Sequence, residues 1–125
     1  MDTLIWVIQG LLAVTFFMVG IVKVVLPKEK LYESRMEFVE DFSQTTVRAI
    51  GTLEVLGAIG LILPMMLDIL PVLTPLAAAG LILTMLGAAL THYRRHEMSE
   101  IAPNMVLLAL ALFVVIGRLA LEPVA

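Results

Sequence analysis

The chain has 125 residues, of which 61% are hydrophobic and 15% are charged, and its formal net charge is −3. A soluble domain is closer to half apolar and a quarter charged, so this composition excludes an ordinary soluble domain and indicates a membrane protein. The chain has no cysteine, which excludes disulfides, CxxC redox chemistry, thiolate nucleophiles and cysteine metal sites.

Four apolar segments are each long enough to cross a bilayer, because a spanning helix needs about 20 mostly apolar residues. None has the alternating pattern of a membrane β-strand. The sequence therefore predicts an all-α fold with a single domain, residues 1–125, built as an antiparallel four-helix transmembrane bundle. The expected spans are residues 4–26, 47–67, 70–91 and 103–121.

The first span carries two polar residues, Gln9 and Lys23, which are two heptads apart. A heptad step turns a helix by only about 20°, so both residues lie on one face, the inner seam of a left-handed bundle. Gln9 is expected to hold helices together, whereas Lys23 either pairs with an acid or extends to the membrane surface. Residues 1–3 include no basic residue and no small-residue cleavage site follows, so we expect a retained helix rather than a signal peptide.

Residues 28–42 are charged yet periodic. Acidic residues occupy one side of the helical pattern and apolar residues the other, which predicts a short amphipathic helix on the cytoplasmic surface. A disordered acidic loop is the alternative. Thr46 is then expected to cap the second span. The apolar positions are Leu31, Tyr32, Met36, Val39 and Phe42.

Glu54 lies within the second span, where a carboxylate is costly and therefore faces the protein interior beside a partner. Gly51, Gly57 and Ala58 surround it on its own helix face, and small residues let a neighbouring backbone approach closely. Lys23 has a matching depth. Because side chains lean toward the N-terminus of their own helix, the two residues lean toward each other in antiparallel spans. The sequence thus predicts a buried Lys23–Glu54 ion pair.

The third and fourth spans add three more polar residues. Pro75 is expected in the first turns of the third span and Pro103 at the first helical position of the fourth. His92 closes the third span, where it either acts as a titrating group or anchors the helix at the interface. Asn104 opens the fourth span and either completes a site or makes a hydrogen bond at the helix start. Arg118, near the far end of this span, either extends to the membrane surface or lines an outer vestibule.

The basic residues are distributed unevenly. Seven of the eight Lys and Arg residues lie in or beside the loops that follow the first and third spans. The positive-inside rule therefore places both loops in the cytoplasm and both termini outside it, in a multi-pass protein of the inner (cytoplasmic) membrane. One of the seven, Arg48, either contacts lipid phosphates at the membrane rim or shares a site with Glu54.

Together these residues outline one candidate ligand-binding site. Lys23, Glu54, His92 and Asn104 come from four different spans and belong to the predicted cytoplasmic half, with Arg48 at its rim. No catalytic motif is visible, so the sequence leaves open whether the protein is an enzyme. Two histidines are weak evidence for a haem or metal site. The basic residues form no surface for nucleic acid.

The motifs at these positions are G-I-V-K (20–23), R-A-I-G-T-L-E (48–54), G-A-I-G-L-I-L-P (57–64), P-L-A-A (75–78) and M-L-G-A (85–88), followed by His92 and Asn104. Over nearly the whole chain they resemble the DoxX-like family of small four-helix membrane proteins. The resemblance implies the bundle fold and carries over Lys23, Arg48, Glu54, His92 and Asn104 as site residues. Relatives are associated with membrane redox complexes, including one linked to quinone-dependent sulfur oxidation, and distant eukaryotic ones resemble receptor-assembly chaperones.

Three functions are compatible with the residues and the resemblance. The first is binding of a small apolar molecule with a polar head, of the quinone or lipid type, including as a membrane subunit of a redox complex; a quinone is the one cofactor it would take. The second is structural: the ion pair fixes helix register and the protein is an assembly partner in the membrane. The third is a proton-coupled carrier, which four short helices would form only as a homodimer or larger complex. The lipid bilayer is a partner in all three.

Overall fold

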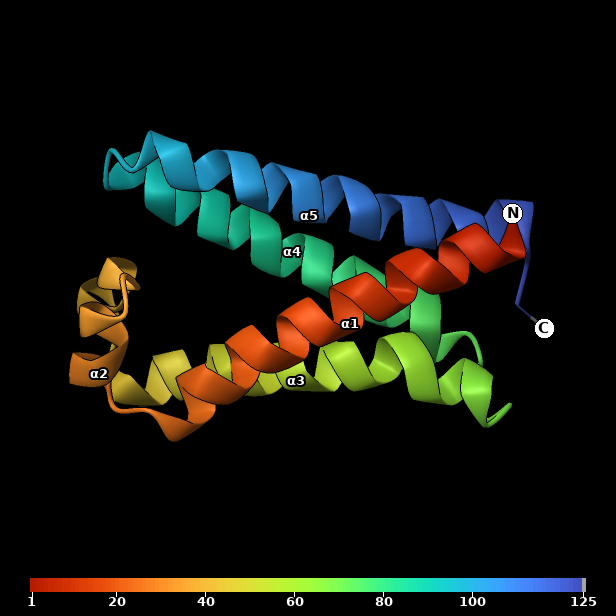
Figure 1. Cartoon of the computed structure of the whole chain (residues 1–125), viewed down its shortest axis with the longest axis horizontal. Coiled ribbons are helices and arrows are strands. Elements are labelled where there is room, and N and C mark those ends of the chain that lie inside the picture. The colour runs from red at the N-terminus through yellow and green to blue at the C-terminus, as the bar shows by residue number, and fades with distance from the viewer. Residues whose placement is uncertain (125) are drawn as a thin grey trace.

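The computed structural model describes residues 1–124 and confirms the predicted all-α architecture of four antiparallel spans (Figure 1). Each of the four long helices is long and apolar enough to cross a membrane. They are α1 (Asp2–Val25), α3 (Gln44–Met66), α4 (Leu73–Arg94) and α5 (Met98–Ile116), the last of which continues into a π-helical turn, η2 (Gly117–Leu121).

The long helices form two pairs, α1 with α3 and α4 with α5, and α3 also packs against α4. Figure 1 shows the pairs close together at the end of the bundle that holds the N-terminus and farther apart at the opposite end. The short elements that connect α1 to α3 lie at this opposite end, which we call the covered end; the other is the terminal end. The orientation of the two ends across the membrane stays a prediction from the charge distribution.

Glycines bring α1 and α3 into backbone contact. A Cβ atom on Gly51 would lie 2.6 Å from the carbonyl oxygen of Gly20, and a Cβ atom on Gly20 would lie 2.7 Å from that of Gly51. Distances this short are not tolerated between a side chain and a rigid backbone, so only glycine fits at either position. The contact fixes the register of the two helices and leaves Lys23 and Glu54 one turn away from it.

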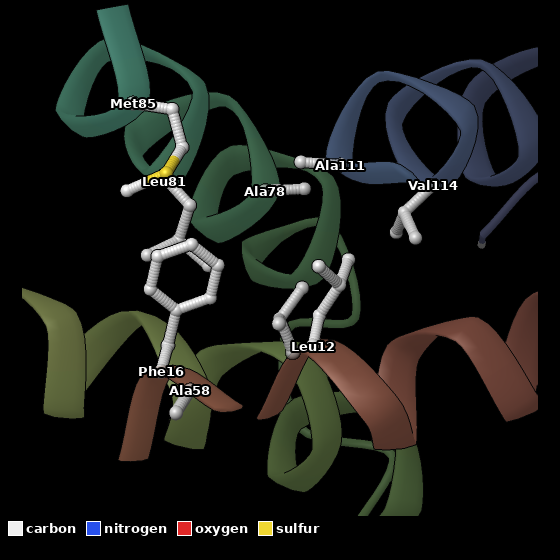
Figure 2. Close-up of a cluster of buried hydrophobic side chains, with 9 residues drawn as sticks. Leu12, Phe16, Ala58, Ala78, Leu81, Met85, Ala111 and Val114 are labelled. Atoms are coloured by element: carbon white, nitrogen blue, oxygen red, sulfur yellow. The ribbon is translucent and has the colours of Figure 1, made fainter. Parts of the chain in front are cut away.

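A layer of apolar side chains fills the middle of the bundle. Figure 2 shows Phe16 of α1 directed toward Leu81 of α4, with Met85 one turn farther along α4. All four long helices contribute, and the layer separates the polar residues of the covered end from those of the terminal end. The buried members are Leu12, Phe16, Ala58, Leu61, Ala78, Leu81, Met85, Ala111 and Val114.

The connection between α1 and α3 contains the predicted short helix, which covers only the first part of the periodic stretch of residues 28–42. It forms α2 (Lys28–Glu33) and a 3-10 helix, η1 (Glu37–Asp41), and Arg35 lies between them in the left-handed region at φ 70°. Leu31 and Val39 both pack with Val47 at the start of α3. This tertiary contact overrides the helical periodicity, which carries no information about it. We call residues 28–42 the covering segment.

The start of α3 also differs from the prediction. Ser43, and not Thr46, is the cap: its hydroxyl accepts a hydrogen bond from the backbone N–H of Thr46 at 3.1 Å. A serine satisfies an otherwise unpaired N–H as well as a threonine does. The helix consequently begins at Gln44, earlier than the apolar run alone indicated.

The prolines of the other two spans give one confirmation and one correction. Pro75 lies in the first turn of α4, which begins at Leu73, as predicted. Pro103 was expected at the first position of the fourth span, but α5 begins at Met98 and contains Pro103 in its interior. The helix starts early because the turn from α4 is tight, with His96 at φ 58°, and one lost backbone hydrogen bond does not end it.

A substitution pair on α1 tests the glycine contact. Gly20→Ala is expected to destabilise the protein by about 1–3 kcal/mol, because the new methyl group would push α3 away. Gly10→Ala, where a Cβ would meet nothing within 4 Å, is the matched control and should leave stability unchanged. Thermal unfolding in detergent measures both, and equal midpoints for the two variants would contradict the close backbone contact.

Candidate functional site

A buried ion pair lies between the first two spans, as predicted. The ammonium nitrogen of Lys23 is 2.6 Å from Oε1 of Glu54, and the two side chains are 10% and 1% exposed. A protein with both buried partners is more stable than one that has lost either of them, because the remaining charge would be buried without a counter-ion. The alternative in which Lys23 extends to the membrane surface is therefore wrong.

The local sequence explains why these two side chains meet. Lys23 lies one turn beyond Gly20 on α1, and Glu54 lies one turn beyond Gly51 on α3. Because the helices are antiparallel, these two turns run in opposite directions from the Gly20–Gly51 contact. Each side chain leans back toward the N-terminus of its own helix, which returns both to the level of the glycines.

The ion pair leaves hydrogen-bonding capacity unused. Oε2 of Glu54 is buried and has no hydrogen-bond partner among residues 1–124. The ammonium group of Lys23 has three N–H donors and gives one to Glu54. It also lies over the ring of Phe38, with 5.4 Å from the nitrogen to the ring centroid. The pair thus offers a strong acceptor and further donors at one point.

A cavity of about 430 Å³ adjoins the ion pair where the helix pairs diverge. Its polar lining includes Lys23, Glu54, His92 and Asn104, one from each long helix. Phe16 also lines the cavity and contributes apolar surface. The structure thus brings four of the five predicted ligand-binding residues into the lining of one cavity. A volume of this size is within the range of small-molecule sites in proteins.

The fifth predicted residue, Arg48, lies apart from the cavity. Its side chain is exposed on α3 and is not part of the cavity lining. Asn104 makes a hydrogen bond near the start of α5, in which its amide nitrogen donates to the carbonyl oxygen of Glu100 at 3.0 Å, and it also lines the cavity. Its role in ligand binding stays a prediction. His92 is likewise in the lining, and its Nδ1 is 2.9 Å from Oε1 of Glu97.

Aromatic residues of the covering segment close the cavity at its end. Phe38 and Phe42 line it, and the two rings meet edge to face at 6.2 Å between centroids. Phe38 also meets the ring of His92 edge to face, at 5.7 Å. The covering segment therefore contacts both helix pairs, since it continues from α1 and touches α4 through this histidine.

Arg95, in the turn between α4 and α5, binds acidic residues of the covering segment. Its guanidinium contacts Oε1 of Glu40 at 2.6 Å, Oδ1 of Asp41 at 2.9 Å and Oε1 of Glu97 at 3.2 Å. A hydrogen bond from His92 and, to a smaller extent, one from Arg95 lower the pKa of Glu97 below its ordinary value. Sequence reasoning missed this cluster; the available signal was the acidic pair Glu40 and Asp41 in one loop and Arg95 in another loop at the same end of the bundle.

A second buried polar cluster lies at the terminal end. The Arg118 side chain is 1% exposed, and its Nε donates to Oε1 of Gln9 at 2.6 Å while Nη1 is 2.5 Å from Oδ1 of Asp2. Gln9 in turn donates to the carbonyl oxygen of Leu61 at 2.5 Å. Gln9 thus holds helices together, as predicted. The expectation that Arg118 extends to the membrane surface is wrong, because Gln9 and Asp2 provide it with interior partners.

Within residues 1–124, no three His, Asp or Glu side chains are grouped so that they could hold a metal ion. In comparisons with known proteins, the model of the DoxX-like family matches residues 7–114, which is most of the chain. No curated protein and no solved structure matches. The matched range includes the four cavity residues, whereas Asp2 and Arg118 of the terminal-end cluster lie outside it.

Single and double substitutions test the ion pair. Glu54→Gln or Lys23→Met alone is expected to destabilise the protein by about 3–5 kcal/mol, and the double variant by clearly less than the sum, because no unpaired charge remains. Thermal or denaturant unfolding in detergent measures the cycle. Glu33→Gln, which removes an exposed acid of the covering segment, is the control. Additive effects would mean that the two charges do not interact.

Removing Arg95 tests how the covering segment is held. Arg95→Gln is expected to increase amide hydrogen exchange in residues 36–42, whereas Arg94→Gln, at an exposed neighbour, should not. Because the pKa of Glu97 is lowered in the folded protein, its contribution is complete above its ordinary pKa and is lost as the pH falls through the folded value. Acid and high salt should therefore lower the protection factors of residues 36–42 in the wild type, after correction for the intrinsic exchange rate at each pH. Identical exchange in both variants would contradict the role of Arg95.

Proposed function

Since this chain belongs to the DoxX-like family of multi-pass membrane proteins, we propose that it binds a small apolar molecule with a polar head, of the quinone or lipid type. The observation that carries the proposal is the Glu54 carboxylate. It is fully buried beside a cavity, with one oxygen on Lys23 and the other without a protein partner. A buried acceptor is costly when unsatisfied, and a ligand head can satisfy it.

The two members of the pair specify the chemistry of that head. Oε2 of Glu54 requires a hydrogen-bond donor, and the remaining N–H groups of Lys23 require an acceptor. A hydroxyl group meets both needs, since it donates one hydrogen and accepts another. A hydroquinone or a long-chain alcohol therefore fits better than an oxidised quinone, whose carbonyl groups only accept.

The rest of the cavity suits an apolar body. Phe16, Phe38 and Met85 supply aromatic and thioether surface around the polar wall, and His92 and Asn104 supply further polar contacts on the opposite helix pair. Such a mixture of an apolar lining with a few convergent polar groups is typical of small-molecule sites. In a redox complex, the chain would present the ligand head to a partner subunit that carries out the electron transfer.

A structural role is the second candidate, and the buried polar clusters at both ends favour it. Lys23–Glu54 joins α1 to α3, and Arg118 joins the start of α1 to the end of α5 through Gln9 and Asp2. Polar pairs of this kind can fix the register of helices. The proton-coupled carrier receives no support, because the apolar layer around Phe16 separates the two polar clusters. Homodimers and larger complexes stay predictions.

A pair of probes tests the proposed head chemistry. 1-Hexadecanol is expected to bind the purified protein in detergent at least about tenfold more tightly than its methyl ether, which lacks the hydroxyl hydrogen. The Lys23→Met/Glu54→Gln double variant should lose this preference, while Glu33→Gln keeps it. Native mass spectrometry measures occupancy. Equal binding of alcohol and ether, or no binding of either, would contradict the proposal and leave the structural role.

A further inference from the structure

A second and larger hollow lies on the outer face of the bundle between α3 and α4. It is a groove of about 750 Å³, and its lining is apolar apart from a single threonine. It runs along α3 from Leu53 to Leu67, which is roughly 21 Å at the helical rise. That length exceeds half of the hydrocarbon core of a bilayer, which is about 15 Å.

Small residues form the floor of this groove. A Cβ on Gly57 would lie 2.8 Å from Cδ2 of Leu81, and a Cβ on Gly60 would lie 2.8 Å from Cβ of Ala77. The hydroxyl of Thr74 also donates to the carbonyl oxygen of Gly60 at 2.9 Å. The helices α3 and α4 are therefore in contact behind the groove. The groove therefore has a closed floor, and its outer side faces the surrounding lipid.

The groove and the polar cavity share two lining residues, Leu53 of α3 and Thr84 of α4. Leu53 is 62% exposed, so its side chain has room to change rotamer. The hydroxyl of Thr84 donates to the carbonyl oxygen of Gly80 at 3.2 Å. Leu53 also comes directly before Glu54 in the chain. The two hollows consequently meet one residue away from the buried carboxylate.

We propose that the groove holds the apolar chain of the molecule whose head lies in the cavity, and that Leu53 and Thr84 form the lateral portal between them. This inference rests on the proposed function and adds the class of ligand: a single-chain amphiphile with a hydroxyl-bearing head and a chain of roughly 20 Å, set by the helical rise along the groove. The head enters from the bilayer beside Leu53, and the chain stays in the groove along α3.

The closed faces of the cavity are consistent with this route. The Gly20–Gly51 contact closes the side between α1 and α3. Phe38 and Phe42 cover the end of the bundle, and Arg95 holds the covering segment there. A lateral route also keeps the apolar chain out of water throughout, which the hydrophobic effect favours. The side between α1 and α5 serves as the comparison below.

Cross-linking tests where the chain lies. The probe is 1-hexadecanol with a diazirine at mid-chain, added to vesicles of phosphatidylcholine and phosphatidylglycerol that contain the protein. Saturable cross-links are expected at Leu56, Gly60 or Ala77, and the Lys23→Met/Glu54→Gln double variant should lose them because the head is no longer held. Cross-links at Leu11, on the lipid-facing side of α1, should be non-saturable and unchanged. Saturable labelling only outside the groove would overturn the inference.

Exchange kinetics test the portal. Leu53→Trp is expected to slow exchange of the bound probe between protein and vesicles by about tenfold. Leu11→Trp, the same change at an unrelated exposed position, should not slow exchange. Val19→Trp, which alters the cavity wall on the α1–α5 side, should slow it less than Leu53→Trp does.

The outcomes separate this inference from the proposed function. If the protein binds the alcohol more tightly than the ether, but the Leu53→Trp variant exchanges its bound probe at the wild-type rate, the inference about the portal is wrong. The proposed head site is then still supported. If native mass spectrometry shows a dimer in which the groove is protected from labelling, a second copy occupies the groove and the inference is wrong. If the wild type binds no probe, both proposals fall.

Discussion

The structure depends on one electrostatic constraint, which is that a carboxylate inside a hydrocarbon layer must have a cation beside it. Lys23 meets that requirement for Glu54 at 2.6 Å, and the Gly20–Gly51 contact brings the helices close enough for the pair to form. A salt bridge in a nonpolar interior contributes little net stability compared with an apolar replacement. On the proposed function, the pair has a second role, which is to bind the head of the ligand in the adjoining cavity.

The second constraint is the divergence of the two helix pairs. Where they meet, apolar side chains such as Phe16 and Leu81 fill the space; where they separate, the covering segment reaches across and Arg95 holds it (Figures 1 and 2). One helix pair thus supplies the charged pair and the other supplies His92 and Asn104. On the proposed function, a ligand head between them would touch all four long helices.

Much of this could be predicted from the sequence, because the deciding forces are local to each helix. Length and apolar composition define the spans, and the depths of Lys23 and Glu54 follow from counting residues along a regular helix. What the sequence did not predict depends on contacts between distant segments. The break at Arg35 follows from shared packing on Val47, and the burial of Arg118 follows from Asp2, far away in the chain. Heptad spacing placed Gln9 on the inner seam but could not identify Arg118 as its partner.

An experimental density map of the protein in lipid nanodiscs, without added ligand, is the most direct test of the central idea. A head group should occupy the cavity within hydrogen-bonding distance of Glu54 Oε2, and a continuous tail should pass Leu53 into the groove. A cavity filled by side chains, or a Glu54 carboxylate turned away from Lys23 toward the acyl chains, would contradict it.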